Sequence, residues 1–166
     1  MTESMTGKSA MTDDVMRHLN ALGIELPAPP PPLGAYKAVV EAGSMLHVSM
    51  QGPVVAGQPA RTGLIGRDLT VEDGRSAARL AVLNALAQIH SYLGGFDRVK
   101  QIVRLEGYLA CTDDFLSHPS VLDGASEFLV DLFKERSGHA RSLCGVRNLP
   151  GNLPVAVVLT VELDSP

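Results

Sequence analysis

The last apolar run of the chain, PVAVVLTVEL (154–163), limits the possible folds more than any other segment, because both of its alternating faces are largely apolar. Successive side chains of a β-strand point to opposite faces of a sheet, so a strand with this pattern is buried on both sides. The run therefore predicts a strand inside a layered structure, with helices over one face and a further layer or another subunit over the other.

The segments before this strand alternate between extended and helical patterns. A Thr-Val-Glu-Asp cap at 70–73 opens the clearest helix, and Gly94-Gly95 ends it. The helical side chains expected to face the core are Val82, Leu86, Ile89, Leu93, Leu122, Ala125, Leu129 and Phe133. The expected elements are a hairpin (36–55, turning at 42–44), a short edge segment (57–66), a helix (70–94), a strand (98–111), a helix (117–137) and two strands (139–149 and 154–163). This order predicts an α+β protein in which two helices cover one face of a mixed sheet.

The first 32 residues are predicted to form an accessory segment. Thr12, Asp13 and Asp14 supply a cap and an acidic first turn for a short amphipathic helix over 12–22. PAPPPP (27–32) follows, a polyproline II connector whose proline nitrogens cannot donate hydrogen bonds. We therefore expect an accessory helix and connector in 1–32 and the main domain in 33–166.

Composition argues against nucleic acids, membranes and metals as partners. A net charge of −4, with 14 scattered Lys and Arg residues, provides no basic stripe for phosphates, and a 4% aromatic content without Trp provides no stacking platform. The five histidines lie far apart, without Cys or carboxylate partners at metal-site spacing. No run approaches the roughly 18 apolar residues of a membrane span. Two thiols and an N-terminus without an apolar signal core lead us to expect a cytoplasmic protein.

Arg141 is the charged residue that stands out within a strand pattern. Alternation places it on the same face as Leu143 and Gly145. A guanidinium on a sheet face needs a carboxylate or carbonyl groups nearby, since removing one member of a buried ion pair costs on the order of 3–5 kcal/mol. Its planar fork suits a ligand carboxylate. The alternative is an arginine that extends to water or pairs with an acidic side chain across a subunit contact.

Four segments carry a resemblance to a known family. HARSLCGVRNLP (139–150), followed by NLPVAV (152–157), resembles a signature in which an A-R-S strand leads through a Leu-Pro turn into the last strand. The other matches are GAY (34–36), VSMQGP (48–53) and FDRVKQIVRLEGYL (96–109), in the same order as in the family. On these motifs the chain is identified as a member of the RidA (YjgF, endoribonuclease L-PSP) family, over about 36–163.

The resemblance implies a fold, an assembly and a reaction. The fold is chorismate-mutase-like, and the assembly is a homotrimer with three sites in the clefts between subunits. The reaction is the hydrolysis of reactive enamine or imine acids, such as 2-iminopropanoate, to 2-oxo acids and ammonia, without a metal or organic cofactor. Arg141 would hold the substrate carboxylate as the catalytic residue. The implied substrate-binding residues are Tyr36, Ser49, Met50, Asp123, Arg141 and Leu143.

The sequence departs from the family pattern at positions that bear on this chemistry. The family's acidic residue on the last strand, which positions the hydrolytic water, falls on Ala156, and Val158 nearby is also apolar. Met50 replaces a glycine and should narrow the pocket. An anionic Asp123 beside Arg141 would compete with a carboxylate substrate. Cys144 is one position out of register with a family cysteine, so we expect a buried core thiol.

Three functions follow from these observations. The first is an imine or enamine deaminase with Arg141 as the anchor, and the second is a non-catalytic module that binds small carboxylates, which Ala156 favours. The third is a ribonuclease, against which the acidic balance and the lack of a histidine pair argue. Glu106 and Glu41 are candidates for an acid that compensates for Ala156.

Overall fold

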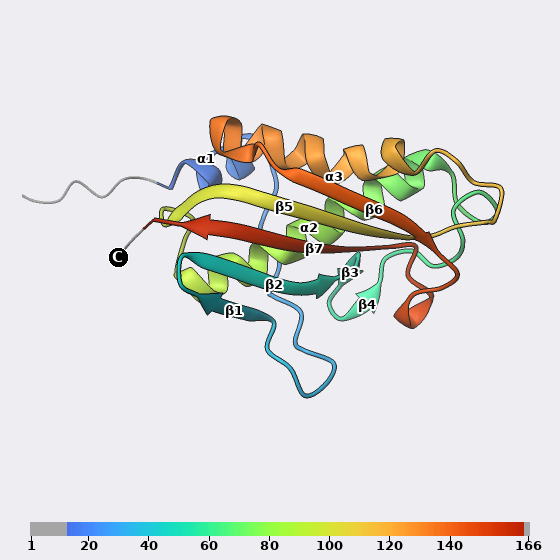
Figure 1. Ribbon diagram of the computed structural model, residues 1–166, viewed down its shortest axis with the longest axis horizontal. Coiled ribbons are helices and arrows are strands. Elements are labelled where there is room, and N and C mark those ends of the chain that lie inside the picture. The colour runs from blue at the N-terminus through green and yellow to red at the C-terminus, as the bar shows by residue number, and fades with distance from the viewer. Residues whose placement is uncertain (1–12, 165–166) are drawn as a thin grey trace, which may run out of the picture.

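A computed structural model describes residues 13–164 of the chain (Figure 1). In chain order the elements are α1 (Asp14–Ala21), β1 (Val39–Ala42), β2 (Met45–Gln51), β3 (Val54–Val55), β4 (Gln58–Pro59), α2 (Val71–Leu93), β5 (Val99–Ala110), α3 (His118–Phe133), β6 (Ala140–Val146) and β7 (Val155–Leu163). Short 3-10 turns, Lys134–Ser137 and Pro150–Asn152, lead into β6 and β7. The expected α+β class is confirmed.

Five strands form one mixed sheet in the order β1-β2-β7-β5-β6. β7, the doubly apolar run, is the middle strand and pairs antiparallel with both β2 and β5. β6 runs parallel to β5 and forms one edge of the sheet. The helix face of β7 is buried, but Val158, Thr160 and Glu162 on its other face are only partly buried, so a second covering layer stays a prediction.

The two long helices lie side by side over one face of the sheet, as Figure 1 shows. We call the covered side of the sheet the helix face and the other side the open face. Seven of the eight side chains predicted to face the core from the helices are buried, and Leu93 is partly buried against the same core. The helix face of β5 and β7 adds Leu105, Leu109, Leu159 and Val161, all fully buried.

Local chemistry fixes the ends of α2. Thr70 accepts a hydrogen bond from the Asp73 amide, and the Asp73 carboxylate accepts one from the Thr70 amide, which completes a capping box. At the other end Gly94 adopts the left-handed conformation, with φ of 76°, and its amide donates to His90 O. These are the boundaries that the sequence predicts.

The short edge segment predicted over 57–66 is present only as the two-residue strand β4, and it does not join the main sheet. β3 and β4 pair only with each other and form a separate two-stranded hairpin. The physical reason is the turn, because Ala56 and Gly57 both have positive φ, the geometry of a tight hairpin that folds the chain back on itself. The Asn84 side chain holds this hairpin on α2 by donating to Gly52 O and Val54 O, at 2.8 and 3.0 Å.

The N-terminal helix joins the main core. Val15 and Leu19 of α1 are fully buried, and the helix packs on α3. Thr12, predicted as part of the cap, lies outside the described residues, and Asp13 caps the helix by accepting from the Val15 and Met16 amides. The same carboxylate accepts from the Phe96 amide at 2.7 Å and so ties α1 to the end of α2. Within residues 13–164, no helix is long and apolar enough to cross a bilayer.

Candidate functional site

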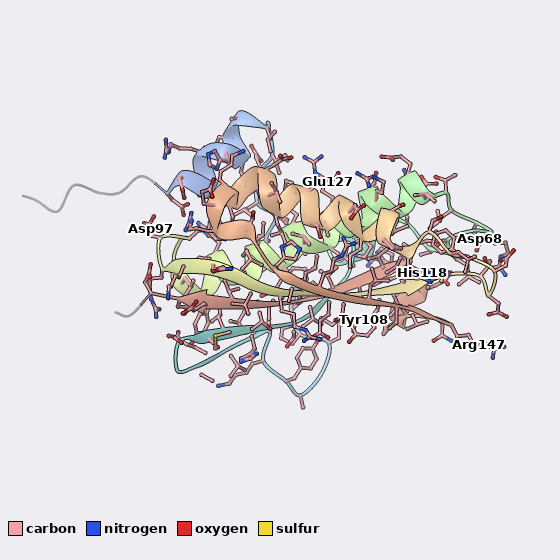
Figure 2. All side chains as sticks on the ribbon, turned by 45° about the horizontal axis from the view of Figure 1, so that its top comes forward. Asp68, Asp97, Tyr108, His118, Glu127 and Arg147 are labelled. Atoms are coloured by element: carbon pink, nitrogen blue, oxygen red, sulfur yellow. The ribbon has the colours of Figure 1, made fainter. Side chains whose placement is uncertain are left out.

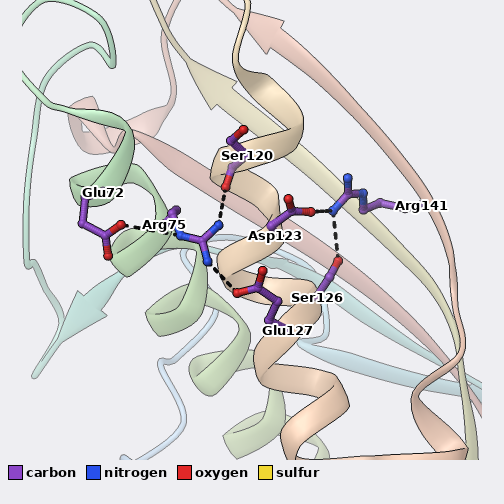
Figure 3. Close-up of polar contacts among 7 residues, drawn as sticks. All are labelled: Glu72, Arg75, Ser120, Asp123, Ser126, Glu127 and Arg141. Carbon is purple, nitrogen blue, oxygen red and sulfur yellow. Dashed lines mark hydrogen bonds and ion pairs between the residues drawn. The ribbon is translucent and has the colours of Figure 1, made fainter.

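Arg141 lies on the helix face of the edge strand β6. It is paired with Leu105 of β5, a fully buried helix-face residue, so its side chain points toward α3. Its Nη1 donates to Asp123 Oδ1 at 2.7 Å and to Ser126 Oγ at 3.2 Å, as Figure 3 shows. Asp123 and Ser126 are one turn apart on the side of α3 that faces β6. The predicted pairing of Arg141 with a carboxylate is therefore present within one chain.

The guanidinium still offers one edge to a ligand. Among the described residues, every hydrogen bond of the Arg141 side chain uses Nη1, and 26% of the side-chain surface is exposed. Nε and Nη2 present two parallel N–H groups on the adjacent edge, which is the geometry that binds a carboxylate through both oxygens. Asp123 neutralises the arginine without filling this edge.

His139, directly before β6, contacts the same serine. His139 Nε2 lies 3.0 Å from Ser126 Oγ, and its Nδ1 lies 2.6 Å from Ser137 O. A carbonyl oxygen can only accept, so Nδ1 carries the proton and Nε2 of the neutral ring is an acceptor. The Ser126 hydroxyl therefore donates to Nε2 while it accepts from Arg141 Nη1. We call Asp123, Ser126, His139 and Arg141 the α3–β6 cluster.

The other predicted site residues do not all join this cluster. Leu143 lies on the same face of β6 as Arg141, next to Gly107 of β5. Ser49 and Met50 belong to β2, which is three strands from β6 and therefore about 14 Å away. Tyr36 lies in the segment before β1, the strand at the opposite edge of the sheet from β6, and its hydroxyl accepts from the Leu33 amide at 3.1 Å. A single chain separates the predicted binding residues into two groups.

The position of the missing acid lies on the other side of the sheet. Ala156 pairs with Tyr108 of β5. Tyr108 follows Gly107, which lies on the helix face, so Tyr108 and Ala156 lie on the opposite side of the sheet. Tyr108 lies on the open face, away from the helices, as Figure 2 shows with Glu127 on the helix side. Ala156 and Arg141 therefore project to opposite faces within one chain. Glu106, a proposed substitute, also lies on the open face, and Glu41 is paired with Arg98 at 2.9 Å.

A chain of polar contacts runs across the open face. Glu106 forms an ion pair with Arg104 Nε at 2.8 Å and accepts a hydrogen bond from the Tyr108 hydroxyl at 3.1 Å, and Arg104 Nη2 donates to Ser142 Oγ at 3.1 Å. The hydrogen bond to Glu106, reinforced by its negative charge, raises the pKa of Tyr108 above its ordinary value. Glu106 is therefore committed to two open-face partners.

The expectation of a buried thiol at Cys144 is wrong for the single chain. Its residue is exposed, because it lies on the open face of the edge strand. Farther along the same face of β6, Val146 packs against the small apolar cluster of Ala110, Leu149 and Ala156, but Cys144 itself stays exposed. Cys111 is partly buried, and its Sγ lies 3.3 Å from His118 Nε2. Burial raises the pKa of the Cys111 thiol above its ordinary value.

Ser126 and His139 are the polar residues of this cluster that sequence reasoning did not select. His139 precedes Arg141 by two residues, so strand alternation would place both on one side. Ser126 follows Asp123 by three residues, so a helix presents both to the same neighbour. These spacings were available in the sequence, but the contact between α3 and β6 that joins them was not.

Comparisons with known proteins give the family. The sequence model described as "YjgF/chorismate_mutase-like, putative endoribonuclease" matches residues 16–163. Protein TCP17 of Trypanosoma cruzi is 38% identical over 152 residues, which cover 91% of this chain and 95% of TCP17.

Solved structures agree with this match. A "putative endoribonuclease" from Shewanella oneidensis is 40% identical with a TM-score of 0.88, over 90% of this chain and 99% of its own. Atu1372 of Agrobacterium tumefaciens, described as of unknown function, is 33% identical with a TM-score of 0.86, over 92% and 94% of the two chains. Escherichia coli TdcF, solved with bound serine, is 22% identical with a TM-score of 0.60, over 83% and 94%, and shows the fold alone. On the family match and these relatives, the chain belongs to the YjgF/chorismate mutase-like family, also known as the RidA family.

Proposed function

We propose that this protein hydrolyses small reactive 2-imino acids to 2-oxo acids and ammonia. The observation that carries the proposal is Arg141, whose Nε and Nη2 make no hydrogen bond to the described residues while Nη1 is held by α3. Membership of the RidA family supplies the reaction class, and the exposed guanidinium edge supplies a binding group for a substrate carboxylate.

In this proposal the protein contributes position and charge. Arg141 holds the carboxylate through two parallel hydrogen bonds, which fixes the neighbouring C=N carbon beside β6. Backbone groups near Ser49, Met50 and Leu143 orient the imine, and water adds to the polarised carbon. The substrate is already activated, so the reaction needs no metal or organic cofactor.

We also propose that the site is completed by a homotrimer. The separation of Ser49 and Met50 from Arg141 by about 14 Å is too great for one small substrate, so a second copy must bring its β2 region to the Arg141 of the first. The partly apolar open face offers a surface for such a contact. Light scattering coupled to gel filtration should give three times the 17.6 kDa mass of the chain. A monomer that retains activity would contradict the shared site.

The activity is tested by generating 2-iminopropanoate in solution and subtracting its spontaneous hydrolysis. Native protein should add rate, and Arg141→Ala should abolish that rate. Arg67→Ala is the matched control, because Arg67 is likewise an exposed arginine paired with an aspartate, Asp68, at 2.8 Å. If both arginine variants keep the native rate, Arg141 is not the anchor.

The second candidate is a non-catalytic module that binds small carboxylates, and Ala156 favours it. Pyruvate and serine are suitable probes, the latter because TdcF was solved with bound serine. Binding of either probe that depends on Arg141, without any added hydrolysis, would support this module and contradict the deaminase.

A further inference from the structure

The α3–β6 cluster contains a hydroxyl and an imidazole, Ser126 and His139, which the binding of a carboxylate by Arg141 does not require. A positive charge alone is enough to anchor an anion. Arg141, however, is also linked through Ser126 to His139, whose Nδ1 proton is directed to Ser137 O at 2.6 Å. This is the arrangement of a hydroxyl, a base and a group that orients the base.

We propose that Ser126 and His139 form a proton relay that takes the place of the missing acid at position 156. The inference rests on the proposed function, because it concerns the same Arg141 site. Ser126 is the hydroxyl that passes a proton to and from the reacting atoms, and His139 is a positioning residue that holds this proton through Ser126.

The direction of the hydrogen bonds supports proton transfer toward His139. Because Nδ1 donates to Ser137 O, Nε2 has a free lone pair, and Ser126 Oγ donates into it across 3.0 Å. Arg141 Nη1 then donates to the same oxygen from 3.2 Å. Imidazole exchanges protons more readily near neutral pH than any other side chain in its unperturbed form. Ser126 and His139 are both partly exposed, so water can reach the pair.

The α3–β6 cluster lies on the side of the sheet where a proton-transferring group is needed. A proton-carrying group must lie on the same side of the sheet as the guanidinium that holds the substrate, and the α3–β6 cluster does. Ala156 and Glu106 project to the open face, so neither position serves Arg141 within one chain. Asp123 lies on the correct side, but its carboxylate already accepts from Arg141 at 2.7 Å.

The relay balances every proton of the reaction. Water adds through its oxygen to C2 of the protonated imine, one water proton passes to Ser126 Oγ, and the Ser126 proton passes to His139 Nε2. The resulting carbinolamine takes this proton onto its nitrogen by the reverse route. The C–N bond then breaks, the hydroxyl proton goes to the departing ammonia, and the 2-oxo acid and ammonium leave behind a neutral imidazole.

The test compares two relay variants with a structural control in the 2-iminopropanoate assay. His139→Gln keeps an oxygen that can accept from Ser126 but cannot take up a proton, and Ser126→Ala removes the hydroxyl. His18→Gln is the control, because His18 Nδ1 also contacts a backbone carbonyl, Leu132 O, at 2.6 Å but lies in α1. Pyruvate affinity and thermal stability are measured for each variant.

General acid–base groups contribute about 10² to 10⁴ in rate, so we expect His139→Gln to lower kcat at least about 100-fold. KM and pyruvate affinity should stay within about twofold, since binding belongs to Arg141. Added imidazole should restore part of the rate to His139→Ala and none to Arg141→Ala. His18→Gln should keep the native kcat.

Three outcomes would overturn the relay, and they are distinguishable. If native protein adds rate and His139→Gln keeps the native kcat, the relay fails while the proposed deaminase stands. If pyruvate affinity falls as far as kcat, His139 serves to position Arg141 and carries no proton. If native protein adds no rate at all, the deaminase itself fails, and the relay fails with it.

Discussion

Asp123 is expected to weaken the binding of any carboxylate at Arg141, so Asp123→Asn should tighten it. Asparagine keeps an oxygen that can accept from Arg141 Nη1, where Asp123 Oδ1 now accepts at 2.7 Å, but it removes the negative charge. The guanidinium should therefore stay in place while the repulsion between the side chain and the ligand disappears.

The size of the effect follows from geometry and exposure. Two carboxylates on adjacent edges of one guanidinium lie about 6 Å apart, and their repulsion is about 0.7 kcal/mol in bulk water and about 3 kcal/mol at an effective dielectric constant of about 20. The side chains of Arg141 and Asp123 are 26% and 42% exposed, so solvent screens most of this energy. We expect a gain of about 1 kcal/mol, or roughly fivefold tighter binding of pyruvate.

Isothermal titration with pyruvate at two salt concentrations checks this reasoning. The gain should shrink toward 1 M salt, where the screening length falls to about 3 Å. Asp68→Asn is the control, because Asp68 also pairs with an exposed arginine but lies outside the α3–β6 cluster. Unchanged or weaker binding by Asp123→Asn would mean that the carboxylate is needed to orient Arg141 and that repulsion is the smaller effect.

Three further predictions concern the packing of α3 on α2, the cap of α2 and a surface ion pair. In Gly124→Ala the new β-carbon would lie 2.8 Å from the Cα of Arg75. This overpacking should outweigh the roughly 1 kcal/mol that alanine gains in a helix, for a net loss of about 1–2 kcal/mol in urea unfolding, and a more stable variant would contradict the packing. Thr70→Ala removes the cap of α2 and should cost about 1 kcal/mol in the same assay. A hydrogen bond from Arg67 helps to hold the pKa of Asp68 at about 2. The contribution of the Arg67–Asp68 pair to stability should therefore be complete above pH 3.8, the ordinary pKa of an aspartate, and should be lost as the pH falls toward 2. An NMR titration of Arg67→Ala should show the pKa of Asp68 rising toward its ordinary value.

Local patterns predicted the elements and the faces of this fold well, because both depend on neighbouring residues. The helical spacing of Leu122 and Leu129 places them in the core, and strand alternation places Arg141 and Leu143 on one face. Burial of a face is a different matter, since it depends on what packs over it. Cys144 illustrates the difference, because a buried thiol is expected there from the sequence, whereas the residue is exposed on the edge strand β6.

The α3–β6 cluster shows the same limit for function. Ser126 and His139 are 13 residues apart, and no periodic pattern links a helix position to a position at the start of a strand. Their contact exists because β6 runs parallel to β5 and so returns beneath α3. Within this cluster the family resemblance indicated Arg141 and Asp123, whereas the contacts of Ser126 and His139 became visible only in three dimensions.

The surroundings of Ala156 explain why an acidic side chain at this position would not serve the Arg141 site of the same chain. Ala156 is 3% exposed and belongs to a small apolar cluster with Ala110 and Leu149. A carboxylate in that cluster would lose hydration without gaining a cation, which costs free energy unless the acid stays protonated. A protonated acid there would also lie across the sheet from Arg141. Within one chain, a base for the Arg141 site must therefore come from the helix face, and on that face the structure brings His139 into hydrogen-bonding distance of Ser126.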